Sequence, residues 1–193
     1  MPDRERGSLL ARPFPAALLL LAAVILAAAA LLAWSRAARD RANLVTDGAQ
    51  WIWLMLDLGE REPLRFWAMR EFSLEAVPAA ARALLFVDPR GSLTVNGSRF
   101  PPGEQRPGSP LRILDVAPAL IAGTNRVVIE AESPTGAGGI LFCLDLPGGR
   151  KIVSDSSWLV ARSEAALSAG GGRRAAVWGR PPMYPWGYPT LGR

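Results

Sequence analysis

Two groups of carboxylates in this sequence are spaced as glycosidic chemistry would need them. Glu130 and Glu132 lie two residues apart in an apolar run, so on a β-strand both side chains would point to the same face. Asp57, Glu60 and Glu62 cluster near an expected turn. Glycoside hydrolysis uses two such groups facing one sugar. A solvated strand face and a solvated loop explain the two groups more simply, and the chain is predicted not to be an enzyme.

Other chemistry is limited by the residue types that the chain lacks. There is no histidine, which excludes Ser-His and Cys-His nucleophile pairs, histidine-ligated haem and most zinc sites. The single cysteine, Cys143, lies in the apolar run 140–144 and is expected to be a buried core residue. Asp88 and Asp115 lie at turns, where we expect each to cap its own backbone. We therefore expect no cofactor and no metal.

The basic residues do not indicate a nucleic-acid partner. Lys151 is the one lysine among 22 lysines and arginines, and the formal net charge is +5. The arginines are scattered along the chain and form no basic helix or stripe, so no nucleic acid is expected to bind.

An apolar stretch near the N-terminus predicts a membrane anchor. Between Arg12 and Arg36 no residue is charged. A helix over 13–35 would be roughly 34 Å long, enough to cross the ~30 Å hydrocarbon core of a lipid bilayer. The sequence thus predicts an N-terminal tail at 1–12, a transmembrane helix at 13–35 and a charged linker at 36–48.

A cleaved signal peptide is the alternative to this anchor. Ala28-Ala29-Ala30 and Ser35-Arg36-Ala37 offer small residues for cleavage, but the apolar run is longer than that of a usual signal peptide. Basic residues flank the span equally, so the positive-inside rule does not orient it. A short tail before a large C-terminal domain favours export. We expect a single-pass protein of the bacterial inner membrane with its C-terminal domain in the periplasm.

The remaining sequence predicts an all-β fold. Short apolar runs alternate with Gly, Pro, Asn and Asp, and no convincing amphipathic helix interrupts them. Asn96-Gly97 suits a two-residue hairpin loop. We expect an antiparallel jelly roll or β-sandwich over 49–163. Its nine predicted strands are 51–58, 64–74, 83–87, 92–95, 112–114, 126–131, 139–146, 151–154 and 158–161.

Three segments carry a resemblance to a known family. They are VDPRGSLTVNG at 87–97, LDVAPALIAGTNRVVIEAE at 114–132 and SDSSW at 154–158. Their order and spacing resemble the galactose-binding-like jelly-roll domains found as sugar-binding modules of bacterial glycoside hydrolases. The most specific part is the turn at 115–118 followed by Gly123-Thr124-Asn125. The resemblance spans residues 51–162 and implies a sandwich of two antiparallel sheets, but it transfers no activity.

Surface aromatic residues would supply the stacking that sugars need. Trp51, Trp53 and Trp67 are the candidates for sugar binding, and the period of two places Trp51 and Trp53 on one strand face. Trp158 occupies a position that the resemblance assigns to the core. We expect most of these rings to be buried.

The C-terminal segment predicts a partner. Residues 164–179 form a Gly-rich hinge in this interpretation, and 180–193 an extended arm, because its four prolines favour a polyproline-like path. The candidate partner-binding residues are Trp178, Met183, Tyr184, Trp186 and Tyr188. Truncation after Arg174 is expected to leave the sandwich folded while loosening an assembly.

These features predict a non-catalytic, membrane-anchored accessory subunit of a larger membrane complex. Its partners would be the lipid bilayer and other membrane-protein subunits, with the antenna and reaction-centre polypeptides of a photosynthetic complex as one candidate set. Such a subunit would scaffold pigment-proteins without an axial histidine of its own. The alternative function is a membrane-tethered carbohydrate-binding module of the cell envelope.

Overall fold

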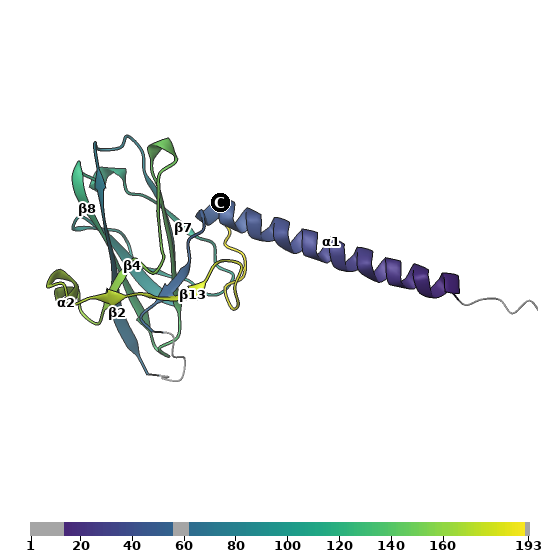
Figure 1. Cartoon of the computed structure of the whole chain (residues 1–193). Coiled ribbons are helices and arrows are strands. Elements are labelled where there is room, and N and C mark those ends of the chain that lie inside the picture. The colour runs from purple at the N-terminus through teal and green to yellow at the C-terminus, as the bar shows by residue number, and fades with distance from the viewer. Residues whose placement is uncertain (1–13, 56–61, 192–193) are drawn as a thin grey trace, which may run out of the picture. The chain divides into compact units, whose positions relative to one another are not determined.

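The computed structural model describes residues 14–55 and 62–191 (Figure 1). The chain divides into two compact units, one that ends at Ala38 and one that spans Arg39–Arg193.

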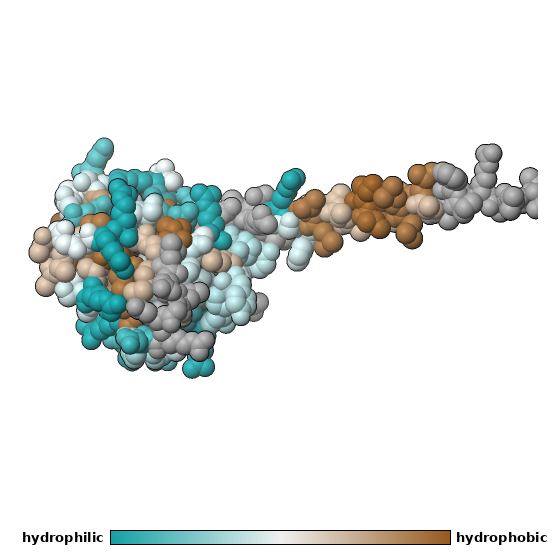
Figure 2. Space-filling view, turned by 60° about the horizontal axis from the view of Figure 1, so that its bottom comes forward, coloured by the Kyte–Doolittle hydropathy of each residue, from teal (hydrophilic) through white to brown (hydrophobic). Residues whose placement is uncertain are grey.

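Helix α1 (Phe14–Thr46) contains the apolar span that the sequence predicts. Its segment Ala17–Ala37 has a mean hydropathy of 2.7 and is long and apolar enough to cross a membrane, and none of its residues is buried within the chain. Figure 2 shows apolar side chains gathered along this helix. A signal sequence near an N-terminus would have the same length and composition.

The predicted linker 36–48 differs from the structure, because helix α1 continues to Thr46. No glycine or proline interrupts residues 36–46, and alanine and arginine, which are common there, are good helix formers. The helix ends where Asp47 and Gly48 adopt left-handed backbone angles, with φ of 49° and 78°. A left-handed residue after the last turn is a common helix stop.

The second unit is a sandwich of two antiparallel sheets, as the sequence predicts (Figure 1). The six-stranded sheet has the order β13-β1-β9-β3-β7, with β10 also paired to β9. Its strands are β1 (Trp51–Trp53), β3 (Arg82–Asp88), β7 (Arg112–Asp115), β9 (Gly139–Asp145), β10 (Lys151–Val153) and β13 (Ala176–Gly179).

The seven-stranded sheet has the order β12-β11-β2-β8-β4-β5, with β6 also paired to β4. Its strands are β2 (Leu64–Leu74), β4 (Arg90–Val95), β5 (Ser98–Arg99), β6 (Gly103–Glu104), β8 (Gly123–Ser133), β11 (Leu159–Ala161) and β12 (Arg173–Arg174). Short helices η1 (Ala117–Ala119), η2 (Pro147–Gly149) and α2 (Glu164–Ser168) connect strands.

Alternation along the strands builds the main core. Strand β2 turns Phe66 and Ala68 inward, and its partner β8 does the same with Ile129 and Ala131. The inner face of the six-stranded sheet contributes Phe142 and its neighbours to the same cluster. A buried interior of this kind supplies the principal driving force of folding. The hairpin at Asn96-Gly97 joins β4 to β5, and both residues have positive φ, as predicted for such a loop.

Strand β1 departs from the period of two. Trp51 and Trp53 were predicted on one face, yet Trp53 belongs to the core between the sheets and Trp51 to a second cluster on the other side. The register of β1 against β13 shifts between Trp51 and Ile52. The extra residue lies on β13, where Trp178 falls between Val177, opposite Ile52, and Gly179, opposite Trp51. The pairing of β1 is thus irregular at the point where the two rings diverge, and the period of two does not hold there.

Strand β9 is buried on both faces. Its inner side chains pack between the sheets, and on its outer side Leu141 joins Trp51, Phe86, Leu111 and Trp186 in the second cluster. Trp186 comes from the C-terminal tail, which thus covers the outer face of the six-stranded sheet. An uninterrupted apolar strand is typical of a sheet covered on both sides.

Residues 164–179 do not form the predicted hinge. They contain helix α2 and strands β12 and β13, which pair with β11 and β1. Gly172 allows close packing here, because a Cβ on it would lie 2.8 Å from Leu167 Cδ2 and 3.0 Å from Leu159 Cβ. Gly170 instead has a left-handed φ of 76°, and the segment is an integral part of the sandwich.

Cys143 is buried in strand β9, as predicted. Burial raises the pKa of its thiol to about 11, since a thiolate would lose its hydration. We expect the native protein to react very slowly with maleimide at pH 8, and the guanidinium-unfolded protein to react quickly. Mass spectrometry of timed samples measures both rates, and fast labelling of the native chain would contradict the buried position.

Candidate functional site

The C-terminal tail folds back onto the sandwich. Trp186 stacks on Trp51, with ring centroids 4.2 Å apart and an interplanar angle of 21°. Further along, the Leu111 N–H donates to the Thr190 carbonyl at 2.7 Å. A tight loop closes between Met183 and Gly187, whose N–H donates back to the Met183 carbonyl at 2.6 Å. The tail is therefore a folded part of the domain, whereas the sequence predicts an extended arm.

The folded tail borders a half-open cavity of about 530 Å³, which we call the tail cavity. Tail residues 183–186 form one wall, and Trp178 of β13 lies beside them. The opposite wall comes from the end of β3, at Asp88 and Pro89, and from residues of the 134–138 loop between β8 and β9. These segments meet because Asp88 pairs with Gly139 across β3 and β9, which brings the ends of both strands together.

Hydrogen bonds fix the loop wall of the tail cavity. Ser133 Oγ donates to the Ala137 carbonyl at 2.6 Å, and Trp53 Nε1 donates to the Gly136 carbonyl at 2.9 Å. Gly138 permits this close approach, because a Cβ there would lie 2.1 Å from the Asp88 carbonyl oxygen. The cavity therefore has one wall fixed by the sandwich and one formed by the tail.

Asp88 is the carboxylate of the tail cavity. Its Oδ2 accepts a hydrogen bond from Trp186 Nε1 at 2.7 Å. Burial raises the pKa of the Asp88 carboxyl above its usual value, and the hydrogen bond from Trp186 opposes this shift in part. The sequence predicts that Asp88 caps its own backbone; it instead binds the tail. Asp115 does cap locally, since its Oδ1 accepts from the Ala117 N–H at 3.1 Å.

The cavity combines aromatic surface with few polar groups. Tyr184 is 92% exposed and lies on the tail wall, while Trp186 is only 8% exposed because most of its ring packs on Trp51. Trp178 Nε1 is buried and has no hydrogen-bond partner among the described residues. Concave sites with aromatic walls and a small number of polar groups are the usual form of a small-ligand site.

The structure brings four of the five predicted partner-binding residues together, namely Trp178, Met183, Tyr184 and Trp186. Tyr188 lies in the same tail but does not line the cavity. The Trp186 ring packs on Trp51 of the same chain, so it is not the free contact surface that the sequence predicts. Asp88 was missed as a site residue, because nothing in its local sequence indicates that residue 186 lies beside it.

The predicted sugar-binding tryptophans are not brought together. Trp51 and Trp53 are each 1% exposed, so neither ring is available to stack on a ligand from solution. Trp67 is half-buried on the outer face of the seven-stranded sheet, where the Arg65 guanidinium lies 5.3 Å from its ring centroid. Trp158 is buried, as the resemblance implies.

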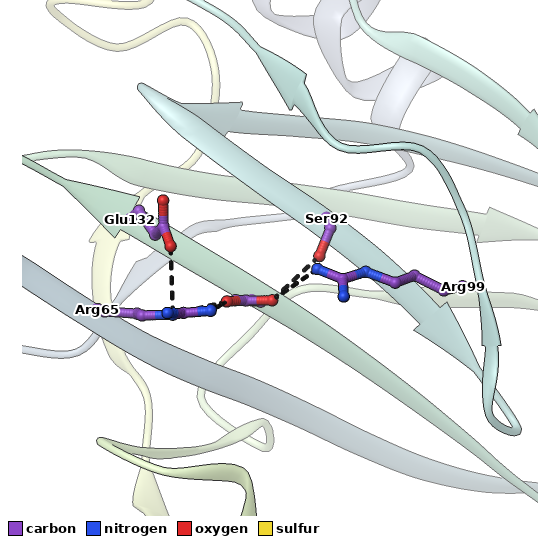
Figure 3. Close-up of polar contacts among 5 residues, drawn as sticks. Arg65, Ser92, Arg99 and Glu132 are labelled. Atoms are coloured by element: carbon purple, nitrogen blue, oxygen red, sulfur yellow. Dashed lines mark hydrogen bonds and ion pairs between the residues drawn. The ribbon is translucent and has the colours of Figure 1, made fainter.

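Glu130 and Glu132 do share one strand face, and both are held by arginine (Figure 3). Arg65 forms ion pairs with both carboxylates, and its Nε lies 3.2 Å from a Glu132 oxygen. Arg99 Nη2 lies 3.2 Å from the second oxygen of Glu130, which is 14% exposed. The Arg65 side chain thus bridges the two carboxylates. Of the second group of candidate carboxylates (Asp57, Glu60 and Glu62), Asp57 and Glu60 lie outside the described residues.

A shallow depression accompanies this ionic network. It has a volume of about 240 Å³ and continues into a larger one of about 550 Å³ that shares Arg65, Arg90 and Glu132. Exposed ion pairs contribute little to stability. The carboxylates and arginines of this face satisfy one another, and within the described residues no group of three or more His, Cys, Asp or Glu side chains is placed to hold a metal ion.

Comparisons with known proteins identify the fold. No protein-family model and no curated protein sequence matches the chain. Among solved structures, an α-L-rhamnosidase from Streptomyces avermitilis complexed with L-rhamnose is similar over 74% of this chain, with a TM-score of 0.63 and 22% identity. A rhamnosidase of glycoside hydrolase family 78 from Bacillus sp. GL1 matches 74% of this chain with a TM-score of 0.65 and 18% identity.

A lectin from Pleurotus ostreatus in complex with GalNAc is also similar, over 75% of this chain, with a TM-score of 0.63 and 19% identity. This chain spans 16% of the Streptomyces rhamnosidase, 19% of the Bacillus rhamnosidase and 46% of the lectin. At these identities the likeness concerns the fold, which agrees with the galactose-binding-like sandwich that the sequence motifs predict. None of these three is a photosynthetic protein, and the expectation of a reaction-centre or antenna subunit has no support in them.

Proposed function

We propose that this chain is a membrane-tethered carbohydrate-binding protein without catalytic activity, and that the sugar binds in the tail cavity. The single observation that carries the proposal is the cavity itself: an exposed tyrosine, two tryptophans and one carboxylate line a single space of about 530 Å³. Sugar rings present an apolar face to aromatic side chains and hydroxyl groups to carboxylates. The cavity offers both kinds of contact.

The fold and the helix support the same proposal. Two similar solved structures are described as complexes with sugars, L-rhamnose and GalNAc. Helix α1 supplies a segment able to anchor the domain to a bilayer. The accessory-subunit function predicted from the sequence needs the tail aromatics on the surface, but Trp186 is stacked within the domain. Location of the domain on the periplasmic side is part of this proposal.

We expect Tyr184→Ala to weaken sugar binding without affecting folding. The Tyr184 ring is 92% exposed, so its removal leaves the core unchanged. An aromatic stacking contact contributes about 0.5–1.5 kcal/mol, which corresponds to a roughly two- to tenfold loss of affinity. Isothermal titration calorimetry of the full chain against a panel of monosaccharides measures the effect. A polyoxyethylene detergent is needed, because maltoside and glucoside detergents present sugar head groups.

Tyr188→Ala is the matched control, since Tyr188 is a tyrosine of the same tail that does not line the cavity. It is expected to bind as the unmodified chain does. If no monosaccharide or short oligosaccharide binds the full chain, the proposed function is wrong. If sugars bind but both variants bind equally well, the site is elsewhere.

A further inference from the structure

The tail cavity has an unusual charge for a chain so rich in arginine. Asp88 is its one carboxylate, and no arginine or lysine is among the described residues that line it. Tyr184 contributes a phenol to the same cavity. Arg90, Arg106 and Glu104 lie nearby but line the separate depression on the seven-stranded sheet, which meets the cavity at Pro89 and Pro134.

The negative charge of Asp88 is only partly compensated. Among the described residues, the one donor to its carboxylate is the neutral indole N–H of Trp186, which reaches Oδ2. The other oxygen of Asp88, Oδ1, accepts no hydrogen bond from the described residues and could accept one from a ligand. A partly buried carboxylate without a positive partner is costly, because the surrounding protein replaces its hydration poorly. A positively charged group beside Oδ1 would offset that cost, and the aromatic walls would also favour a cation.

We propose that the tail cavity selects amino sugars, whose ammonium group pairs with the Asp88 carboxylate while the sugar ring lies against the aromatic wall. This inference rests on the proposed function, because it names the class of sugar that the same site would take. Acidic sugars are excluded by the same charge: a second carboxylate beside Asp88 would meet like-charge repulsion where little water screens it. Neutral sugars keep the ring contacts and lose the ion pair.

The test compares sugars that differ at one substituent. Calorimetry of the full chain at pH 6.5 would use glucosamine, glucose, N-acetylglucosamine and glucuronate, and then the galactose series. We expect glucosamine to bind about tenfold more tightly than glucose, a difference of about 1.4 kcal/mol, and glucuronate to bind least. N-acetylglucosamine, which has no charge, should lose the advantage of the amino sugar.

Asp88→Asn is the decisive variant. Asparagine keeps an oxygen that can accept from Trp186 and removes the charge, so we expect equal affinity for glucosamine and glucose. Asp115→Asn removes the same charge from an exposed turn outside the cavity and should keep the preference. Thermal unfolding of both variants shows whether the Asp88→Asn domain is still folded.

A pH series tests the unmodified chain without any substitution. The ammonium group stays charged as pH falls, whereas Asp88 becomes protonated and neutral. Since burial raises its pKa, the preference for glucosamine should disappear at a higher pH than an ordinary aspartate would give. Equal binding of glucosamine and glucose at pH 6.5 would overturn the amino-sugar inference and leave the proposed function standing. Absence of binding by every sugar would overturn both.

Discussion

A chain that ends after Arg174 is expected to lose most of its folding stability. The deletion removes strand β13, which pairs with β1 at the edge of the six-stranded sheet, and Trp186, which covers the outer face of that sheet. Truncating one buried tryptophan to alanine costs about 3–5 kcal/mol. Native domains have a net stability of about 5–15 kcal/mol, so loss of a strand and a tryptophan together threatens the fold. The sequence alone had predicted an intact sandwich.

Urea unfolding followed by tryptophan fluorescence measures this effect on the full chain and on the shortened chain in the same detergent. Two controls separate the contributions of Trp186 and of strand β13 to the loss of stability. Trp186→Ala should show about 3–5 kcal/mol of the loss, and a chain that ends after Tyr188 should lose much less, because it keeps both the β13 pairing and the stacked ring. An unchanged unfolding midpoint after the truncation at Arg174 would show that the tail does not belong to the folded domain.

Asn125→Ala should be the most damaging single polar substitution. Asn125 has no exposed surface, and its side chain makes four hydrogen bonds. Oδ1 accepts from the Ile121 N–H at 2.9 Å and from Asn96 Nδ2 at 2.7 Å. Nδ2 donates to the carbonyls of Ile121 at 2.7 Å and Gly123 at 3.0 Å. Alanine leaves several buried groups without partners, each at a cost of about 1–3 kcal/mol.

We therefore expect Asn125→Ala to lower the free energy of unfolding by roughly 3 kcal/mol or more. Urea unfolding measures it, with Thr124→Ala as the control, because Thr124 is the exposed neighbour on the same strand. Asn125→Asp keeps the shape of the side chain, but it replaces the donor Nδ2 by a carboxylate oxygen that cannot donate, so it should also be destabilising. A loss below 1 kcal/mol for Asn125→Ala would contradict the structural role of this network.

The network also gives the segment Gly123-Thr124-Asn125 a structural role in this domain. Asn96, at the hairpin after β4, donates to both Asn125 and the Ala119 carbonyl, and its own oxygen accepts from the Arg126 N–H. The two asparagines thus connect a hairpin to the loop before β8. Local sequence was enough to predict the strands and the hairpin here, because alternation and turn residues are local signals.

Other parts of the domain depend on contacts between residues distant in sequence. Trp51 lies at a register shift between β1 and β13, and β13 is more than a hundred residues further along the chain. Asp88 became part of a site only because the tail returns to it. One signal could have indicated this earlier: the uninterrupted apolar run of β9 needs a cover on each face. The aromatic tail is the segment that supplies the outer cover.

Helix α1 also bears on the sugar affinity that each single tail cavity would need. Under the proposed function, a domain held in a bilayer by its 17–37 segment would diffuse laterally and remain near one surface. Several copies that meet a repetitive glycan then act as a multivalent array, and the effective concentration of each second contact is set by the tether. Weak, rapidly exchanging contacts at single cavities would add up to firm adhesion, while each copy remains free to slide along the surface.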